Sequence, residues 1–179
     1  TRCSAPLSIA ELDLRTMRID RLDALSDVSA AEWNALVPDH NPFLSHEFLS
    51  ALERHQCVGE SVGWLPQHIV CRDDRGKLLG AAPLYLKFNS YGEFVFDWSW
   101  AEAYRRHGLP YYPKLVGAIP YTPATGPRLL SAPDQVHPEV TRQALMDSAL
   151  ECARHQRCSS IHWLFPTPAE VSSLQDKGF

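Results

Sequence analysis

The fold is decided by the stretch Trp64–Phe88, which reads WLPQHIVCRDDRGKLLGAAPLYLKF. Residues 64–72 alternate in the period-2 pattern of a strand, and the residues after the turn return as its partner. Asp73–Gly76 has the composition of a hairpin turn, in which Gly76 can adopt a positive φ. Pro83 lacks an N–H donor, so it predicts a bulge or a sheet edge in the second strand.

Helix and strand signals extend outward from this hairpin in both directions. Before it we predict, in order, a strand at 14–22, a helix begun by the capping pattern of Ser29 and Glu32 and ended by Pro38, an extended link at 42–44, and a helix at 46–56 capped by Ser45. After it we predict a strand at 93–98, a helix at 100–107, strands at 112–119 and 128–131, a helix at 139–156, a buried strand at 159–165 and a helix beginning at Pro168. This order predicts an α/β (α+β) fold whose mixed, mainly antiparallel sheet is flanked by helices.

Composition and length limit the classes of protein to which the chain can belong. The length fits one domain, which we assign to residues 14–179 after a leader at 1–13. A net charge of −4 gives no broad surface for nucleic acid. No run reaches the roughly 20 apolar residues that span a bilayer, and no secretory signal precedes the domain. The five cysteines form no C-x-x-C pair, so we expect reduced cysteines in a cytoplasmic protein.

The segment Phe96–Leu130 concentrates side chains that can build a shaped pocket. It reads FDWSWAEAYRRHGLPYYPKLVGAIPYTPATGPRLL and combines two Trp, four Tyr and five Pro with three Arg and one His. Rigid aromatic faces beside cations and tight turns are typical of a ligand site. We therefore place the candidate site in this segment.

The order of elements is similar to the GNAT acyltransferase fold, in which a strand and two helices precede antiparallel strands and a helix–strand–helix unit follows. The Gly178-Phe179 pair resembles the turn after the last helix of that unit. The residues that resemble the FemAB-like family of predicted bacterial N-acyltransferases, described as peptidoglycan biosynthesis or recognition proteins, are Pro42–Phe48, Asp97–Ala101, Tyr104-Arg105, Tyr111–Leu115 and Pro120–Pro123. Family members continue into a second, more basic half. We therefore expect an N-terminal half, cut before its last strands, whose partner is the missing C-terminal half.

The resemblance implies an acyl-CoA or aminoacyl-tRNA donor and no metal. GNAT proteins that use CoA hold its pyrophosphate on a glycine-rich loop at a helix N-terminus. Residues 132–137, before the long predicted helix, contain no glycine, and Asp134 there would repel phosphate. The cofactor therefore stays unknown: aminoacyl-tRNA needs no such loop, and a CoA ester could bind in the missing half.

Direct acyl transfer requires that the donor carbonyl is polarised, that the amine loses a proton and that both are held in line. Under the resemblance, we assign catalysis to Tyr111, Tyr121 and His107. We assign substrate binding to Asp97, Trp98, Trp100, Tyr104, Arg105, Tyr112, Lys114 and Thr122. Simpler interpretations stay open, because buried tryptophans often form core and most surface arginines are solvated.

Three functions remain open from the sequence. The first is an N-acyltransferase or aminoacyltransferase acting on the amine of a small molecule or peptide, related to the cell wall. The second is a non-catalytic module that recognises a peptidoglycan peptide or glycan. The third is an interaction domain that buries its aromatic segment against the missing half. The sequence carries no Gly-x-Ser-x-Gly elbow and no H-E-x-x-H motif, so serine and metal hydrolysis have no support.

Overall fold

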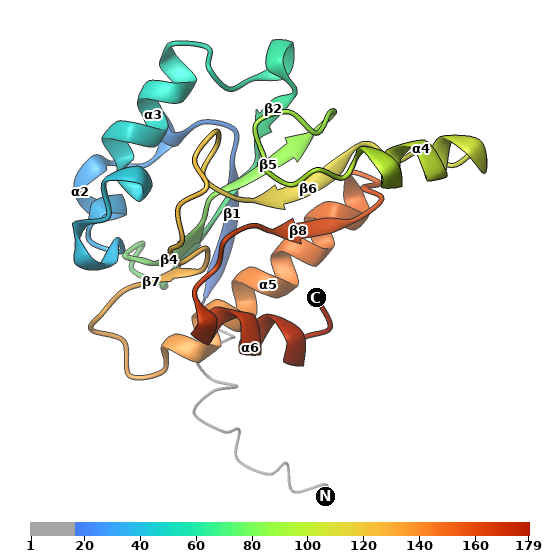
Figure 1. Cartoon of the computed structure of the whole chain (residues 1–179). Coiled ribbons are helices and arrows are strands. Elements are labelled where there is room, and N and C mark those ends of the chain that lie inside the picture. Colours follow the sequence, from blue (N-terminus) through green and yellow to red (C-terminus); the bar gives the residue numbers. More distant parts are fainter. Residues whose placement is uncertain (1–16) are drawn as a thin grey trace, which may run out of the picture.

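The computed structural model of the protein describes residues 17–179, so the predicted leader at 1–13 and the first residues of the predicted first strand lie outside the described residues. A layer of strands runs through the centre, with helices on both of its faces (Figure 1). The strands are β1 (Arg18–Leu22), β2 (Trp64–Pro66), β3 (His68–Arg72), β4 (Leu78–Ala82), β5 (Leu84–Lys87), β6 (Lys114–Gly117), β7 (Leu130–Ser131) and β8 (Ile161–Trp163). The helices are α2 (Ala30–Asn34), α3 (His46–Arg54), α4 (Trp98–Arg106), α5 (Pro138–His155) and α6 (Pro168–Asp176).

The predicted hairpin is confirmed. β2 pairs antiparallel with β5 and β3 with β4, in one register that joins Trp64 to Lys87 and Cys71 to Gly80. Gly76 lies in the turn with a φ of +83°. The strand orders are β1-β3-β4-β7 and β2-β5-β6-β8. The fold is therefore mixed α/β, with two mostly antiparallel sheets in place of the single sheet predicted.

Pro83 divides the second strand of the hairpin into β4 and β5. The Gln67 N–H donates to the Leu84 carbonyl at 2.8 Å, so the backbone N–H and C=O groups of Leu84 point toward the first strand of the hairpin. The Ala132 N–H donates to the Leu79 carbonyl at 2.8 Å, so the backbone N–H and C=O groups of Leu79 point toward β7. Because donors alternate between the two sides of a strand, the N–H that Pro83 lacks belongs to the side of β6 and β7.

The neighbouring strand is interrupted on that side. β6 follows β5 as far as Gly117, which lies opposite Leu84, and the chain returns to the sheet at Leu130, opposite Ala81. We call the intervening residues 118–129 the excursion. β8 pairs parallel with β6, whereas the outer edge of β7 has no strand partner among residues 17–179.

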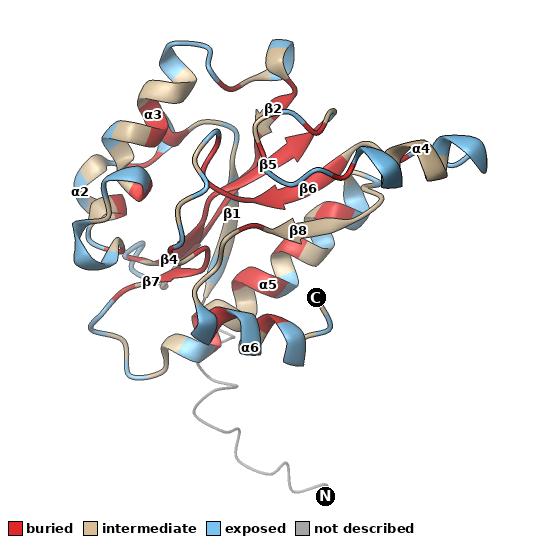
Figure 2. Ribbon diagram, in the orientation of Figure 1, coloured by how far each residue is buried: buried red, intermediate tan, exposed pale blue. Residues whose placement is uncertain are grey.

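Each face of the sheet is covered by a different pair of helices. Val70 of β3 packs with Trp33 of α2 and Leu49 of α3. Ile69, one residue earlier, points to the opposite face and packs with Leu145 of α5. The central strands β3, β4, β5 and β6 are consequently the most buried part of the molecule (Figure 2).

Local signals set most helix ends correctly. The side chains of Ser29 and Ser45 cap α2 and α3 by accepting backbone N–H groups. The long predicted helix is confirmed as α5, and Gly178 follows α6 with a φ of +90°. The four described cysteines are free, as predicted, and Cys3 lies outside the described residues.

Three predicted segments differ from the structure. Pro42–Leu44 forms a 3-10 turn rather than an extended link, because the Asn41 side chain caps it. The strand predicted at 93–98 is wrong: Glu93 and Asp97 both turn inward as buried ions, and α4 begins directly afterwards. The strand predicted as buried at 159–165 is the short, half-buried β8.

A buried ion network anchors α4, which projects from the body of the molecule (Figure 1). Lys114 Nζ donates to Glu93 Oε2 at 2.7 Å and to Asp97 Oδ2 at 2.5 Å. The Tyr111 hydroxyl donates to the same Asp97 oxygen at 2.6 Å. Burial alone would raise the pKa of Asp97, but hydrogen bonds from Lys114, Ser90 and Tyr111 outweigh it and lower that pKa to about 2. The network ties the segment before α4 to the start of β6.

We expect Gly80→Ala to destabilise the fold by about 1–3 kcal/mol, as overpacked cores do. The added Cβ would lie 2.7 Å from the Leu130 carbonyl oxygen and 2.5 Å from Thr141 Cγ2. A backbone oxygen cannot rotate away, so β7 has to shift from β4. Urea denaturation measures the loss, with Arg75→Ala in the exposed turn as a control that changes stability by less than about 0.5 kcal/mol. Equal stabilities for both variants would contradict this packing.

We expect Asp97→Asn to remove part of the acid sensitivity of the fold. The pKa of Asp97 is about 2 in the folded protein, below the roughly 3.9 of an unfolded chain. The stability that Asp97 contributes is therefore present above about pH 4 and is lost as the pH falls toward 2, by about 2–3 kcal/mol. Unfolding free energies of both proteins across this range should converge as the pH falls, and parallel curves would argue against the network.

Candidate functional site

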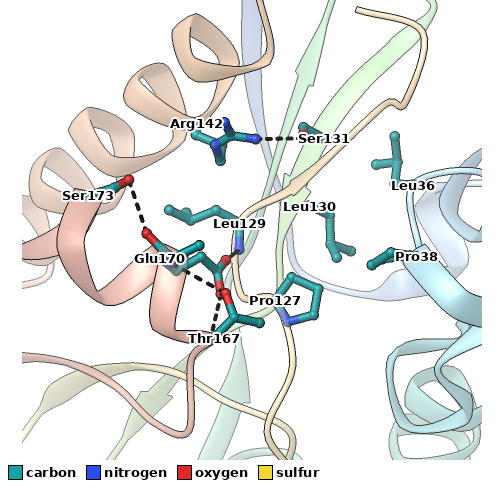
Figure 3. A pocket seen from close by; sticks show the side chains of 11 residues that line it. Leu36, Pro38, Pro127, Leu129, Leu130, Ser131, Arg142, Thr167, Glu170 and Ser173 are labelled. Atoms are coloured by element: carbon teal, nitrogen blue, oxygen red, sulfur yellow. Dashed lines mark hydrogen bonds between the residues drawn. The ribbon is translucent and has the colours of Figure 1, made fainter.

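A cavity lies beside the outer edge of β7, opposite α6 (Figure 3). Its volume is about 350 Å³, within the range of small-molecule sites. Apolar side chains from the end of α2 and from β7 form part of its wall, and polar side chains of α5 and α6 form the rest. We call it the β7–α6 cavity, and its lining includes Leu36, Leu129, Ser131, Arg142, Thr167 and Glu170.

Backbone N–H groups at the outer edge of β7 point toward this cavity. The N–H groups of Arg128 and Leu129 both donate to Glu170 Oε1 at 2.7 Å. We call these two donors the N–H pair. The Ala132 N–H faces β4, so the Ser131 N–H, one residue earlier, faces outward by the alternation of the strand.

Glu170 reaches the N–H pair from the first turn of α6. Its second oxygen, Oε2, accepts from the Thr167 N–H and from Thr167 Oγ1, both at 3.1 Å. Thr167 Oγ1 accepts in turn from the Glu170 N–H at 3.4 Å, which completes a capping box. Glu170 is only 7% exposed. Its carboxylate therefore joins the start of a helix to the edge of a sheet.

The Arg128 side chain fixes the excursion from inside. It is fully buried and donates to the carbonyls of Leu164 at 2.8 Å, Gly126 at 3.0 Å and Ala124 at 2.7 Å. Burial lowers the pKa of Arg128 to about 10, and the charge of Glu170 opposes this shift. With its guanidinium held on several carbonyls, Arg128 keeps the N–H pair in one direction.

Arg142 is the cation of the β7–α6 cavity. It lies on the second turn of α5, and its Nη1 donates to Ser131 Oγ at 3.1 Å (Figure 3). The glycine-free loop at 132–137 precedes this helix. Asp134 in that loop pairs with Lys77 at 2.5 Å, which offsets the repulsion of phosphate expected from the sequence.

Four of the predicted site residues line a second depression, which we call the aromatic hollow, and a fifth packs beside it. It has a volume of about 490 Å³ beside α4, and Trp98, Arg105, Tyr111 and Tyr112 line it. Tyr104 packs edge-on against Tyr111 with ring centroids 5.1 Å apart. These residues form one aromatic surface with a cation at its rim.

The ion network holds three of the predicted residues near this hollow. Asp97 and Lys114 are buried, and the Tyr111 hydroxyl donates to Asp97. Burial, the hydrogen bond to Asp97 and its negative charge raise the pKa of Tyr111. In this arrangement Tyr111 offers a ligand its ring, while its hydroxyl is engaged.

The remaining predicted residues line neither the aromatic hollow nor the β7–α6 cavity. Tyr121 lies in the excursion and packs on Trp64, with ring centroids 5.7 Å apart. Thr122 Oγ1 donates to the Pro120 carbonyl at 3.1 Å. Trp100 is 65% exposed. His107 is exposed as well, and its Nδ1 lies 2.8 Å from the Ala103 carbonyl oxygen. The roles assigned to these residues stay predictions.

Sequence reasoning missed the residues that shape the β7–α6 cavity, namely Arg128, Arg142 and Glu170. One signal was available, because Thr167 and Glu170 match the spacing of a capping box. That pattern predicts the contact of Glu170 Oε2 with Thr167 but not the contact of Oε1 with the N–H pair.

Residues 17–179 contain neither a cluster of metal-ligating side chains nor a helix that could span a membrane. No three His, Cys, Asp or Glu side chains in this range are grouped to hold a metal ion. No helix of the described chain is long and apolar enough to cross a bilayer.

Two solved structures have a similar fold. An aminoglycoside antibiotic 6'-N-acetyltransferase from Acinetobacter baumannii is 14% identical at a TM-score of 0.50, covering 91% of this chain and 90% of its own. An acetyltransferase from Trypanosoma brucei is 16% identical at a TM-score of 0.52, covering 91% and 92%. At these identities the likeness shows a GNAT-type fold, as the sequence predicted. No curated protein sequence matches the chain.

The sequence model of one family covers most of the chain. It is the FemAB-like family, described as peptidoglycan biosynthesis/recognition, and it matches residues 24–179. The resemblance predicted from the central segment is thereby confirmed, and the chain belongs to the FemAB-like family.

Proposed function

We propose that this chain is an N-acyltransferase domain that takes an acyl or aminoacyl donor into the β7–α6 cavity and transfers the acyl group to an amine. The observation that carries the proposal is the N–H pair beside β7, which donates to Glu170 at the wall of a cavity of ligand size. Such donors suit a carbonyl oxygen that gains negative charge during the transfer. The GNAT-type fold and the family support the same class of reaction.

The cavity offers groups for both ends of a donor. In the transfer, the amine nitrogen attacks the acyl carbon and loses a proton, and the thiolate or ribose oxygen of the donor leaves. Backbone N–H groups would hold the acyl oxygen, and Arg142 would bind an anionic part of the donor. Because the loop at 132–137 contains no glycine, we assign phosphate recognition to the Arg142 side chain rather than to a backbone loop.

We propose that the acceptor is related to the cell wall, in keeping with the family description. Trp98, Tyr112 and Arg105 in the aromatic hollow provide aromatic faces for a sugar or peptide and a cation for a carboxylate. The hollow lies near the start of β6 and the cavity lies beyond its end. The hollow would therefore bind a part of the acceptor remote from the reacting amine.

A non-catalytic recognition module is the second candidate. It is favoured by the loop before α5, which contains no glycine and so offers no backbone cradle for the pyrophosphate of CoA. Such a module would bind a peptidoglycan peptide or glycan in the aromatic hollow and transfer nothing. Acyl transfer from a CoA ester or an aminoacyl-tRNA mimic to an amine acceptor decides between the two functions.

We expect Arg142→Ala to weaken the binding of acetyl-CoA by about 10- to 100-fold, the usual effect of losing a charged hydrogen bond. Isothermal titration calorimetry measures the affinity. Arg154→Ala is the matched control, because Arg154 is an exposed cation in the last turn of the same helix. Equal affinities for the two variants, or no binding by the unmodified protein, would remove the donor from this cavity.

We expect Arg105→Ala to impair muropeptide binding about tenfold while the fold stays intact. Arg105 is 74% exposed, and its partner within the described part of the chain is Glu102 on its own helix. Its loss should therefore change stability by less than about 0.5 kcal/mol. Arg106→Ala is the control, since Arg106 contacts the same Glu102 but does not line the aromatic hollow. Unchanged muropeptide affinity in Arg105→Ala would remove this residue from the site.

A further inference from the structure

We propose that Glu170 is a displaceable plug, whose carboxylate fills the N–H pair until a carbonyl oxygen of the acyl donor takes its place. The inference rests on the proposed function, because it concerns the regulation of the same cavity. It adds a role for a residue that the proposed chemistry does not use.

A single oxygen atom satisfies the N–H pair. Glu170 Oε1 accepts from Arg128 and from Leu129, each at 2.7 Å. Two converging backbone donors with such short contacts favour an oxygen that carries negative charge. The acyl oxygen of a donor under attack has this property, so the carboxylate and the donor compete for one position.

The N–H pair is held too firmly to turn toward another partner. The buried Arg128 guanidinium donates to the Ala124 carbonyl within the excursion and to the Leu164 carbonyl after β8, and β7 is paired with β4 directly afterwards. If Glu170 left without a replacement, two buried donors would lose their acceptor at a considerable cost. Displacement is therefore an exchange of one oxygen for another and requires a ligand with a suitable oxygen.

Glu170 has other groups within the same cavity to receive it. Its second oxygen is already held by Thr167 at the start of α6, so the side chain can turn without losing the helix cap. Arg142 lines the same cavity, and within residues 17–179 its hydrogen bond goes to a serine hydroxyl, Ser131 Oγ, while its charge also acts on Glu139. A displaced carboxylate would gain the attraction of this cation.

The exchange predicts discrimination between acylated and free CoA. Acetyl-CoA carries the carbonyl oxygen that the N–H pair needs, whereas free CoA has a thiol and leaves Glu170 in place. In the unmodified protein, acetyl-CoA has to displace the carboxylate, so its advantage over CoA is small. With the plug removed, we expect the ratio of the CoA to the acetyl-CoA dissociation constant to rise about tenfold.

The first experiment uses a small carboxylate in place of the donor. We expect Glu170→Ala to fold with a lower melting temperature, because both the cap and the N–H pair lose their acceptor. Sodium acetate should restore part of that loss by filling the vacated position, while sodium chloride at the same ionic strength should not. Thr167→Ala is the matched control: it weakens the same helix cap but leaves Oε1 on the N–H pair, so acetate should not stabilise it specifically.

The second experiment uses the donor itself on Glu170→Gln, which keeps a carbonyl oxygen and removes the charge. We expect this variant to fold with a somewhat lower melting temperature, because its one acceptor oxygen cannot serve both the N–H pair and the Thr167 N–H. We expect it to bind acetyl-CoA more tightly than the unmodified protein, with unchanged affinity for CoA. Acetate rescue without any binding of CoA esters would reject the proposed donor and leave a carboxylate-binding N–H pair. An acetate response no larger than that of Thr167→Ala, or weaker acetyl-CoA binding by Glu170→Gln, would show that Glu170 is a fixed structural residue.

Discussion

Pro83 has no N–H to give to the strand beside it, and the architecture around the cavity follows from that missing donor. The adjacent strand pairs with β5 until Gly117 and leaves the sheet where the donor is absent. It returns as the two-residue β7, which pairs with β4 on one side only. A strand edge left open in this way must find acceptors elsewhere or face a ligand. The outer edge of β7 does both, because Glu170 supplies an acceptor and the β7–α6 cavity lies beside it.

The buried cations near the two ends of β6 have different kinds of partners. At its start, Lys114 meets two carboxylates, Glu93 and Asp97, within 2.7 Å and is fully neutralised. Beyond its end, the Arg128 guanidinium is surrounded mainly by carbonyls, and the carboxylate that balances it is Glu170, bound to its backbone N–H. The first arrangement is closed and suits an anchor for α4. The second leaves a positive centre whose balancing anion lies at the wall of a cavity, which suits a place where one anion is exchanged for another.

Sequence patterns predicted the parts of the fold that contacts between residues near in sequence determine. The hairpin, its break at Pro83, the serine caps and the long helix depend on neighbours in sequence, and all were predicted. The segment at 93–98 was predicted as a strand because its pattern alternates, yet its ions turn toward Lys114, which lies 21 residues from Glu93 and 17 from Asp97. Glu170 is the sharpest case, since its cap partner lies three residues away and its strand partners lie 41 and 42 residues away. The fold family followed from the order of elements, whereas the cavity needed contacts that no sequence pattern encodes.

The Glu170 contact also separates a site in use from one that has lost its function. Glu170 engages two backbone donors, the N–H groups of Arg128 and Leu129, through one oxygen and keeps the other on its own helix. The outward Ser131 N–H is left for a ligand. Arg142, the cavity's own cation, binds a hydroxyl rather than this carboxylate. The Glu170 carboxylate on the N–H pair, the Arg142 cation and the cavity that both residues line fit a site that is occupied first by a side chain of the protein and then by its ligand. This is the reason to prefer the transferase over the recognition module.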